Sequence, residues 1–316
     1  MNKHSRLVLV VLLLLSLTAV SFGTALAQDD MSTVIIGTTD EPSGIDSGYA
    51  YAVHDWELLK NTGDALMGYE PGTANLIPRL AADAPEVSED GTVYTFTLRE
   101  GIQFADGTPL TAQVYVDSFM RAMTLDGDIQ GFVQGFVESV SAPDELTVEF
   151  TLTQPYGFFP AVAATAPFIP MNPNQFPLDE LNTTPDTLDG VGPYRMTEYT
   201  PGEQLVLERN EVYWDTENAA HIDRVIVRYF ADPTTMSQAI ENGEIDIAWR
   251  TLGPVEAARL QDIEGVTVTQ IDAPALRYLA FNKQTPPHDN PNVQQALAAA
   301  IDREVIVDRV FEGRNI

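Results

Sequence analysis

Residues 78–123 contain local signals that predict the order turn, strand, turn and helix. Residues 88–91 (SEDG) predict a turn, because Asp favours turns and Gly accepts positive φ at little cost. In residues 92–98 (TVYTFTL) large apolar side chains recur at every second position, which is the period of a half-buried strand. The side chains expected to face the core are Tyr94, Phe96 and Leu98.

The same segment predicts a helix near its end. Asp106 and Gly107 give a second turn signal, and Thr111 has the position and side chain of a helix N-cap. Hydrophobic residues then recur at helical spacing. The face expected to pack inward carries Val116, Phe119, Met120 and Met123.

The first 27 residues have the pattern of a secretory signal peptide. Lys3 and Arg6 give a positive start, residues 7–20 are almost wholly apolar, and the small residues 25–27 fit a cleavage site near Ala27. A membrane anchor is the alternative, but the apolar run is shorter than the ~20 residues that a span needs. We therefore expect a mature protein that begins at residue 28.

Composition excludes several classes of site. The chain has no cysteine, which rules out disulfides, zinc–thiolate sites and thiol nucleophiles. Loss of Lys3 and Arg6 with the signal peptide takes the formal net charge from −29 to −31. Such an acidic surface repels nucleic acid and anionic lipid. Solubility outside the cell accounts for this charge, and attraction for cationic ligands is an alternative that charge alone does not support.

The rest of the chain alternates strand and helix signals. A buried strand is expected at residues 33–38, followed by a polar, Gly-rich loop and a helix over residues 54–67. Six prolines in residues 155–177 argue against regular helix or central strand there. Further strands are expected at residues 137–153 (a pair), 194–199, 205–209 and 222–230, with a helix at 233–242 that stops at Asn242-Gly243.

No catalytic motif is present. The sequence lacks a Walker A loop, the zinc-protease H-E-x-x-H and the hydrolase G-x-S-x-G. The histidines are isolated in the sequence, and residues 126–128 (DGD) lack the ligand spacing of a calcium loop. We therefore expect no enzyme activity, no catalytic residue, no metal site and no cofactor.

Several segments resemble a known family. Residues 78–112 (PRLAADAPEVSEDGTVYTFTLREGIQFADGTPLTA) resemble the signature of the extracellular peptide-binding proteins of ABC importers, the oligopeptide-, dipeptide- and nickel-binding group. Residues 190–194 (GVGPY), 243–247 (GEIDI) and 293–297 (VQQAL) resemble further blocks of that family. The family commonly has Glu-Asp where this chain has Gln113-Val114, so Thr111 lacks an acidic capping-box partner.

The resemblance implies an α/β fold, periplasmic-binding-protein-like, of type II (class C). Residues 28–60 and 172–275 would form the core of the first lobe, and residues 61–171 an additional α+β subdomain. Residues 276–316 would begin the second lobe. Family members continue well beyond this point, so the resemblance implies a C-terminally truncated chain that binds ligand weakly by itself.

The resemblance also implies a ligand cleft lined by the strand after GEIDI. Trp249 would supply a flat apolar wall, and Arg250 would meet a ligand carboxylate by a two-point contact. The alternative is a core tryptophan and a surface ion pair. Tyr278 lies on an expected crossing strand, residues 276–282, and would also face the ligand.

The loop after the first strand is expected to flank the same cleft. Tyr49 and Tyr51 share one direction if the loop is extended, and Asp40 would meet a ligand amine. In several relatives the acid that pairs with the peptide amino terminus lies in the second lobe, so the resemblance assigns no residue to it here.

The function implied is capture of di- or oligopeptides outside the cytoplasmic membrane for an ABC permease, in the periplasm or extracellular space. No lipid anchor is expected, because there is no cysteine to carry lipid. No nucleic-acid partner is expected either, because the surface is acidic. The same fold binding a nickel chelate, haem, sugar or opine ligand is one alternative. A secreted hydrolase and a gene fragment that does not fold are the others.

Overall fold

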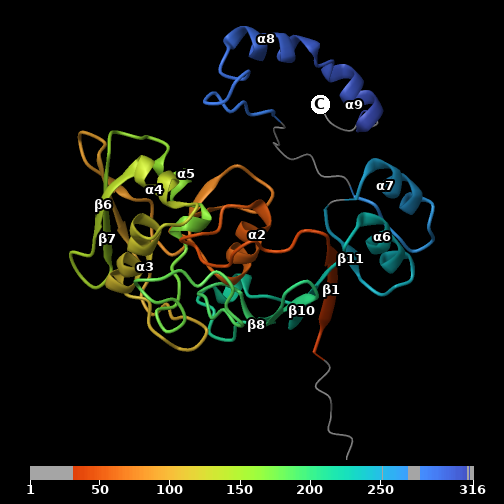
Figure 1. The fold of residues 1–316 in the computed structure, drawn as a ribbon. Coiled ribbons are helices and arrows are strands. Elements are labelled where there is room, and N and C mark those ends of the chain that lie inside the picture. The colour runs from red at the N-terminus through yellow and green to blue at the C-terminus, as the bar shows by residue number, and fades with distance from the viewer. Residues whose placement is uncertain (1–30, 251, 270–277, 312, 314–316) are drawn as a thin grey trace, which may run out of the picture.

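The computed structural model describes residues 31–250, 252–269, 278–311 and 313. The expected signal peptide lies outside these residues. Figure 1 shows two sheets set apart along the molecule, with helices against each. None of the helices in the described ranges has the length and apolar content that a bilayer crossing needs.

A five-stranded sheet has the order β11-β1-β10-β9-β8. It comprises β1 (Thr33–Thr38), β8 (Tyr194–Thr200), β9 (Gln204–Arg209), β10 (Arg224–Tyr229) and β11 (Ile247–Ala248). Strand β1 runs parallel to both β10 and β11, whereas β8, β9 and β10 are antiparallel neighbours. The strands expected at residues 194–199, 205–209 and 222–230 are confirmed as β8, β9 and β10.

Helices lie on both faces of this sheet. Helix α2 (Val53–Thr62) lies on one face, near Ile36 of β1, and α6 (Pro233–Glu241) packs on the other, near Ile35. Helix α7 (Pro254–Gln261) packs against α6 (Figure 1). Strand β1 was expected to be buried, but only Gly37 and Thr38 are, because the face that carries Ile36 opens into a pocket.

A four-stranded antiparallel sheet has the order β4-β5-β7-β6. Its strands are β4 (Glu86–Val87), β5 (Val93–Thr97), β6 (Val137–Ser141) and β7 (Thr147–Leu152). Helices α3 (Ala112–Thr124) and α4 (Gln130–Phe136) pack beside it. A short hairpin, β2 (Met67–Tyr69) with β3 (Leu76–Pro78), completes this part of the chain.

An aromatic core joins this sheet to α3. Phe150 of β7 lies at the centre, 5.9 Å between ring centroids from Phe96 and 5.1 Å from Phe119, both edge-on. Phe159 and Phe168 close the cluster at 5.5 and 5.7 Å from Phe150. Such edge-to-face pairs add to the stabilisation from apolar burial.

The sequence signals of residues 78–123 are confirmed, with one exception. Tyr94, Phe96 and Leu98 are buried, and the Thr111 hydroxyl accepts a hydrogen bond from the Val114 amide at 3.2 Å. Met120 was expected to pack inward, but its side chain is exposed. The buried stripe of α3 instead includes Tyr115, Ser118 and Ala122, so the apolar face is rotated away from Met120.

Three other expectations are wrong. Helix α2 ends at Thr62, not at residue 67, because Gly63 leaves the helical conformation and packs against Ile169. The Pro-rich segment does contain a single helical turn, α5 (Phe159–Val162), and a 3₁₀ turn, η1 (Ala166–Phe168). Residues 278–282 form no strand, since no described strand pairs with them. Residues 276 and 277 lie outside the described residues.

A buried ion pair fixes the loop after β1. The Arg121 guanidinium in α3 donates to Asp46 Oδ1 at 2.9 Å and to Asp46 Oδ2, and both side chains are at most 1% exposed. The amides of Gly48 and Asn182 donate to the same carboxylate. The ion pair therefore holds the loop against α3, and the hydrogen bond from the Asn182 amide holds it against a segment that is distant in the sequence.

A second network joins the end of α2 to the segment after β9. Asp64 accepts hydrogen bonds from Arg79 Nε, Tyr213 Oη and Trp214 Nε1, each at 3.0 Å. Burial raises the pKa of the Asp64 carboxyl, while the hydrogen bonds from these three residues act in the opposite direction. The guanidiniums of Arg79 and Arg99 lie 5.0 and 4.9 Å from the Trp214 ring centroid, as cation–π pairs do.

The GVGPY segment, residues 190–194, passes very close to the end of α2. A Cβ on Gly190 would lie 1.9 Å from the Thr62 carbonyl oxygen, and one on Gly192 would lie 2.4 Å from the Gly63 amide nitrogen. Gly192 also donates its amide hydrogen to Thr62 O at 2.9 Å. Glycine is required here because the two backbones are in contact.

Beyond residue 278 the described chain forms α8 (Pro291–Ala300) and α9 (Arg303–Val310). Neither helix has a buried side chain. The remaining 3₁₀ turn, η2 (Thr216–Asn218), follows β9. The division into a first-lobe core, an additional subdomain and the start of a second lobe stays a prediction.

Candidate functional site

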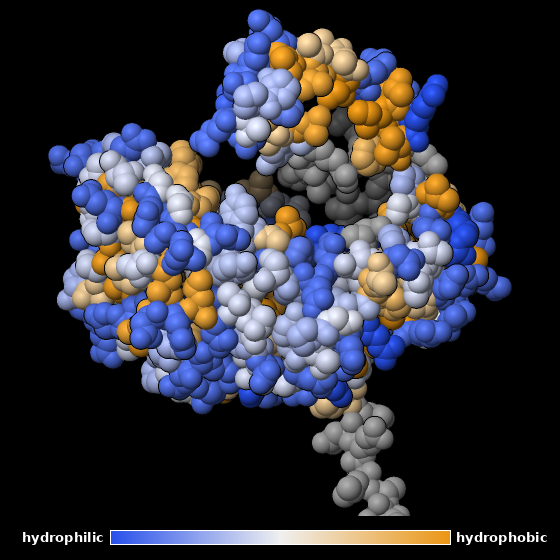
Figure 2. Space-filling model, in the orientation of Figure 1, coloured by the Kyte–Doolittle hydropathy of each residue, from blue (hydrophilic) through white to orange (hydrophobic). Residues whose placement is uncertain are grey.

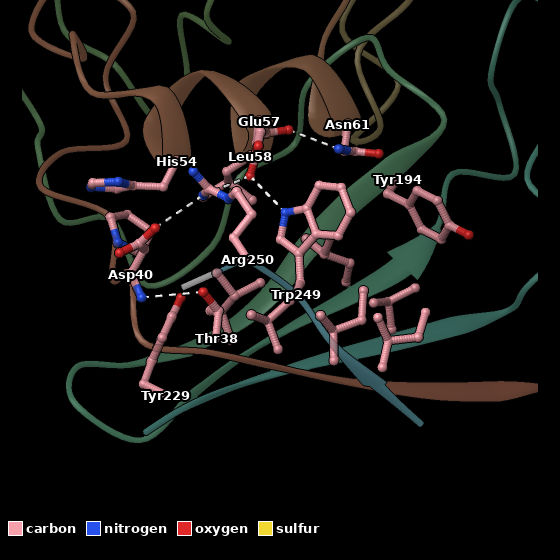
Figure 3. Close-up of a pocket in the computed structure, with 17 residues that line it drawn as sticks. Thr38, Asp40, His54, Glu57, Leu58, Asn61, Tyr194, Tyr229, Trp249 and Arg250 are labelled. Carbon is pink, nitrogen blue, oxygen red and sulfur yellow. Dashed lines mark hydrogen bonds and ion pairs between the residues drawn. The ribbon is translucent and has the colours of Figure 1, made fainter. Parts of the chain in front are cut away.

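A pocket of about 490 Å³ lies between α2 and the five-stranded sheet. Its floor is apolar, since β1, β9, β10 and β11 present aliphatic side chains to it: Ile36, Leu205, Leu207, Val225, Val227 and Ile247. Figure 3 shows α2 above this floor, with the polar side chains Asp40, His54 and Arg250 at one end and Tyr194 at the other. The pocket therefore has an apolar body and one polar end.

One face of α2 supplies the upper wall. His54, Glu57, Leu58 and Asn61 line the pocket at positions i, i+3, i+4 and i+7, which share one side of a helix. The helix is held in place at its start by Asp55, whose carboxylate accepts from the Ser43 hydroxyl at 2.7 Å and the Ala52 amide at 3.1 Å.

The chain leaves β11 directly into the pocket. Trp249 follows β11, its amide donates to Gly37 O at 2.8 Å, and its side chain is 40% exposed. Arg250 has φ of 55°, the only non-glycine residue with positive φ in the described ranges. This conformation costs about 1–2 kcal/mol, and it turns the Arg250 side chain toward α2 (Figure 3).

Glu57 connects these two side chains. Its Oε2 accepts from Arg250 Nη2 at 2.9 Å and from Trp249 Nε1 at 3.3 Å. Arg250 Nη2 also lies 3.4 Å from Asp40 Oδ2. Because α2, the loop after β1 and the end of β11 each contribute one charged group, the polar end of the pocket is built from three separate parts of the chain.

Two tyrosines complete the lining. The Tyr229 hydroxyl is buried and has no hydrogen-bond partner within the described residues. Burial raises the pKa of Tyr229, and the nearby Tyr199 and Glu41 raise it further. Burial also raises the pKa of Tyr194. Both tyrosines are therefore neutral hydrogen-bonding groups at physiological pH.

The structure brings together three of the six side chains expected at the cleft, Asp40, Trp249 and Arg250. Tyr49 and Tyr51 do not line this pocket. Tyr51 is 60% exposed and lies edge-on to Trp56, with ring centroids 6.3 Å apart. Tyr278 is 78% exposed and is not among the lining residues.

The site residues expected from the sequence did not include Glu57 or the other residues of the α2 wall. A signal was present, because the polar residues His54, Glu57 and Asn61 recur on one side of a helix whose other side is buried through Leu59 and Thr62. Within the described residues, no three His, Cys, Asp or Glu side chains are placed to hold a metal ion. The arrangement fits non-covalent binding of a ligand with an extended apolar part.

Comparison with known proteins decides the family. A family model described as "Bacterial extracellular solute-binding proteins, family 5 Middle" matches residues 75–316. The chain belongs to this family. Its members are solute-binding proteins, and the fold class expected from the sequence, the α/β type II periplasmic-binding-protein fold, is confirmed for the part of the fold that this chain covers.

Relatives within solute-binding family 5 are similar over most of the chain. It is 28% identical to the dipeptide-binding protein DppE of Bacillus subtilis (strain 168) over 305 residues, 89% of this chain and 53% of that protein. The solved murein tripeptide binding protein MppA of Escherichia coli matches with a TM-score of 0.77 at 25% identity. That match covers 90% of this chain and 58% of MppA.

A second solved structure shows the fold alone. NikZ from Campylobacter jejuni, solved in complex with Ni(L-His), matches with a TM-score of 0.73 at 23% identity, over 89% of this chain and 55% of NikZ. The chain thus spans little more than half the length of the relatives it matches.

Proposed function

We propose that this chain supplies one wall of the ligand site in the substrate-binding component of an ABC importer, and that the ligand is a di- or oligopeptide. The support is membership of solute-binding family 5, together with relatives named for dipeptide and murein tripeptide binding. The protein would act in the periplasm or extracellular space and deliver its ligand to the permease subunits of the importer.

The observation that carries the proposal is the position of Trp249 and Arg250. They follow the last strand of the sheet directly and line a pocket large enough for an amino-acid side chain. Peptides held in an extended form present alternate side chains to such pockets, while their backbone groups provide most hydrogen bonds. A half-exposed indole is a suitable apolar wall for that side chain.

Thermal unfolding of the full-length protein tests the ligand class. We expect tri-alanine to raise the melting temperature, since a ligand at 100 times its Kd stabilises the folded state by about 2.7 kcal/mol. Trp249→Ala should lower peptide affinity about tenfold, as loss of a central aromatic contact does. Phe158→Ala is the control, because Phe158 is equally aromatic, 55% exposed and outside the pocket.

A different outcome would identify the alternatives. A rise in melting temperature with a nickel–histidine complex, haem, a sugar or an opine, and none with peptides, would contradict the peptide proposal. Turnover of peptide or glycoside substrates by pure protein would favour a hydrolase instead.

A further inference from the structure

The polar end of the pocket carries an excess of negative charge. With histidine counted as uncharged in the formal charge, its charged lining residues are Asp40, Glu57 and Arg250. Two carboxylates therefore face one guanidinium, which leaves one net negative charge at the site. Because the pocket is partly screened from water, this charge acts more strongly on a ligand than one on the open surface.

Arg250 is already engaged by the protein. Its Nη2 contacts Glu57 Oε2 at 2.9 Å and Asp40 Oδ2 at 3.4 Å. Its Nε is buried without a hydrogen-bond partner in the described part of the chain, so a ligand cannot reach that nitrogen unless the side chain moves. Because Nε is buried and Nη2 already contacts Glu57 and Asp40, a two-point contact from a ligand carboxylate would have to compete for Nη2, which argues against the contact expected from the sequence.

The Asp40 carboxylate, in contrast, can accept further hydrogen bonds. Its carboxylate accepts no hydrogen bond from the described residues, its one ion pair is the 3.4 Å contact to Arg250, and the side chain is 29% exposed. The Asp40 backbone is fixed by its amide, which donates to Thr38 Oγ1 at 3.1 Å. The carboxylate is therefore positioned at the pocket end with an oxygen free to accept from a donor.

The apolar body of the pocket defines the rest of the ligand group. Val225, Val227 and Leu205 belong to the apolar floor, which suits an aliphatic chain. Trp249 forms the adjoining wall (Figure 3). Lys and Arg side chains combine an aliphatic stem with a cationic head. A cation near an indole face is also attracted by the ring quadrupole.

We propose that this pocket selects peptides that carry a lysine or arginine side chain, with the stem over the apolar floor and the cationic head beside Asp40. Asp40 is the specificity-determining residue, and Glu57 positions it indirectly by holding Arg250. This inference rests on the proposed peptide-binding function and narrows its substrate class to basic peptides.

Calorimetry with three matched peptides on the full-length protein tests this selectivity. Ala-Lys-Ala should bind about 5–10 times more tightly than Ala-norleucine-Ala, which has the stem without the charge, and Ala-Glu-Ala should bind most weakly. Asp40→Asn should abolish the preference for the lysine peptide over the norleucine peptide. Asp83→Asn is the matched control, since Asp83 is exposed, forms no hydrogen bond or ion pair with the described residues and lies outside the pocket.

The outcomes separate the two proposals. Equal affinity for the lysine and norleucine peptides, tightest binding of the glutamate peptide, or a lysine preference that survives Asp40→Asn would overturn the basic-peptide proposal and leave peptide capture intact. Binding of none of the three peptides would overturn peptide capture, and the basic-peptide class with it.

Fluorescence quenching tests the pocket charge without any ligand. The emission lost on Trp249→Phe isolates Trp249 from the other two tryptophans. When each ion's quenching is divided by its quenching of free N-acetyltryptophanamide, caesium should quench this emission more strongly than iodide, and Asp40→Asn, but not Asp83→Asn, should reduce the difference. Stronger quenching by iodide on this scale, or an unchanged difference in Asp40→Asn, would contradict a net negative site.

Discussion

Replacing Arg121 by Ala is expected to lower the free energy of unfolding by about 3–5 kcal/mol, the cost of removing one partner of a buried ion pair. The substitution leaves the Asp46 carboxylate buried and without its counter-ion. It also removes the donors to the carbonyl oxygens of Pro177 and Glu180. Urea unfolding followed by circular dichroism measures the change.

Arg209→Ala is the matched control. Arg209 also pairs with carboxylates, those of Glu211 and Asp223, but its side chain is 35% exposed. An exposed pair contributes no more than about 1 kcal/mol, so this variant should unfold near the parent midpoint. An Arg121→Ala protein as stable as the Arg209→Ala protein would show that the pair does not hold the loop between β1 and α2.

Gly190→Ala is expected to destabilise the protein by at least about 2 kcal/mol, as overpacking against rigid neighbours does. The added methyl group would lie 1.9 Å from the Thr62 carbonyl oxygen and 2.8 Å from its carbon. Both are backbone atoms at the end of α2, so no side-chain rotation relieves the clash. The helix end or the GVGPY segment must move, and the wall of the pocket moves with it.

Gly157→Ala provides the comparison for Gly190→Ala. A Cβ at Gly157 meets no atom within 4 Å, and the residue does not have positive φ. Its stability should stay within about 0.5 kcal/mol of the parent. Equal melting temperatures for the two glycine variants would contradict the close approach between residues 190–192 and α2.

Local sequence signals predicted helices and strands correctly where the turn residues and the spacing of apolar side chains indicate the same element. Alternation in residues 92–98 identified β5 and its buried face, and Asp106-Gly107 and Thr111 identified the turn and the start of α3. The end of α2 was missed because Gly63 stops the helix by packing against Ile169, more than one hundred residues away in the sequence. Met120 was misplaced because the position of the buried stripe depends on which elements α3 meets.

The candidate site was predictable only in part, for a similar reason. Trp249, Arg250 and Asp40 follow strands, and family resemblance led to them. Glu57 lies on a helix and became visible as a site residue only when α2 was placed against the end of β11. Only the tertiary structure shows that Glu57 is the partner of Arg250. Because Glu57 and Asp40 already contact Arg250, we expect the ligand to present a cation to this end of the pocket and not a carboxylate.

The most direct test of whether this pocket binds peptide is photo-crosslinking of a peptide to the full-length protein. A tripeptide that carries benzoylphenylalanine is irradiated with the protein, and tryptic fragments are identified by mass spectrometry. Within this chain, label is expected in residues 229–250, which contain Trp249, and in the fragment that ends at Lys60, which contains Asp40 and Glu57. Excess tri-alanine should compete with the labelled peptide and reduce the labelling of both fragments. Label confined to fragments without a pocket-lining residue, such as residues 100–121, would contradict the assignment of this pocket as a peptide site.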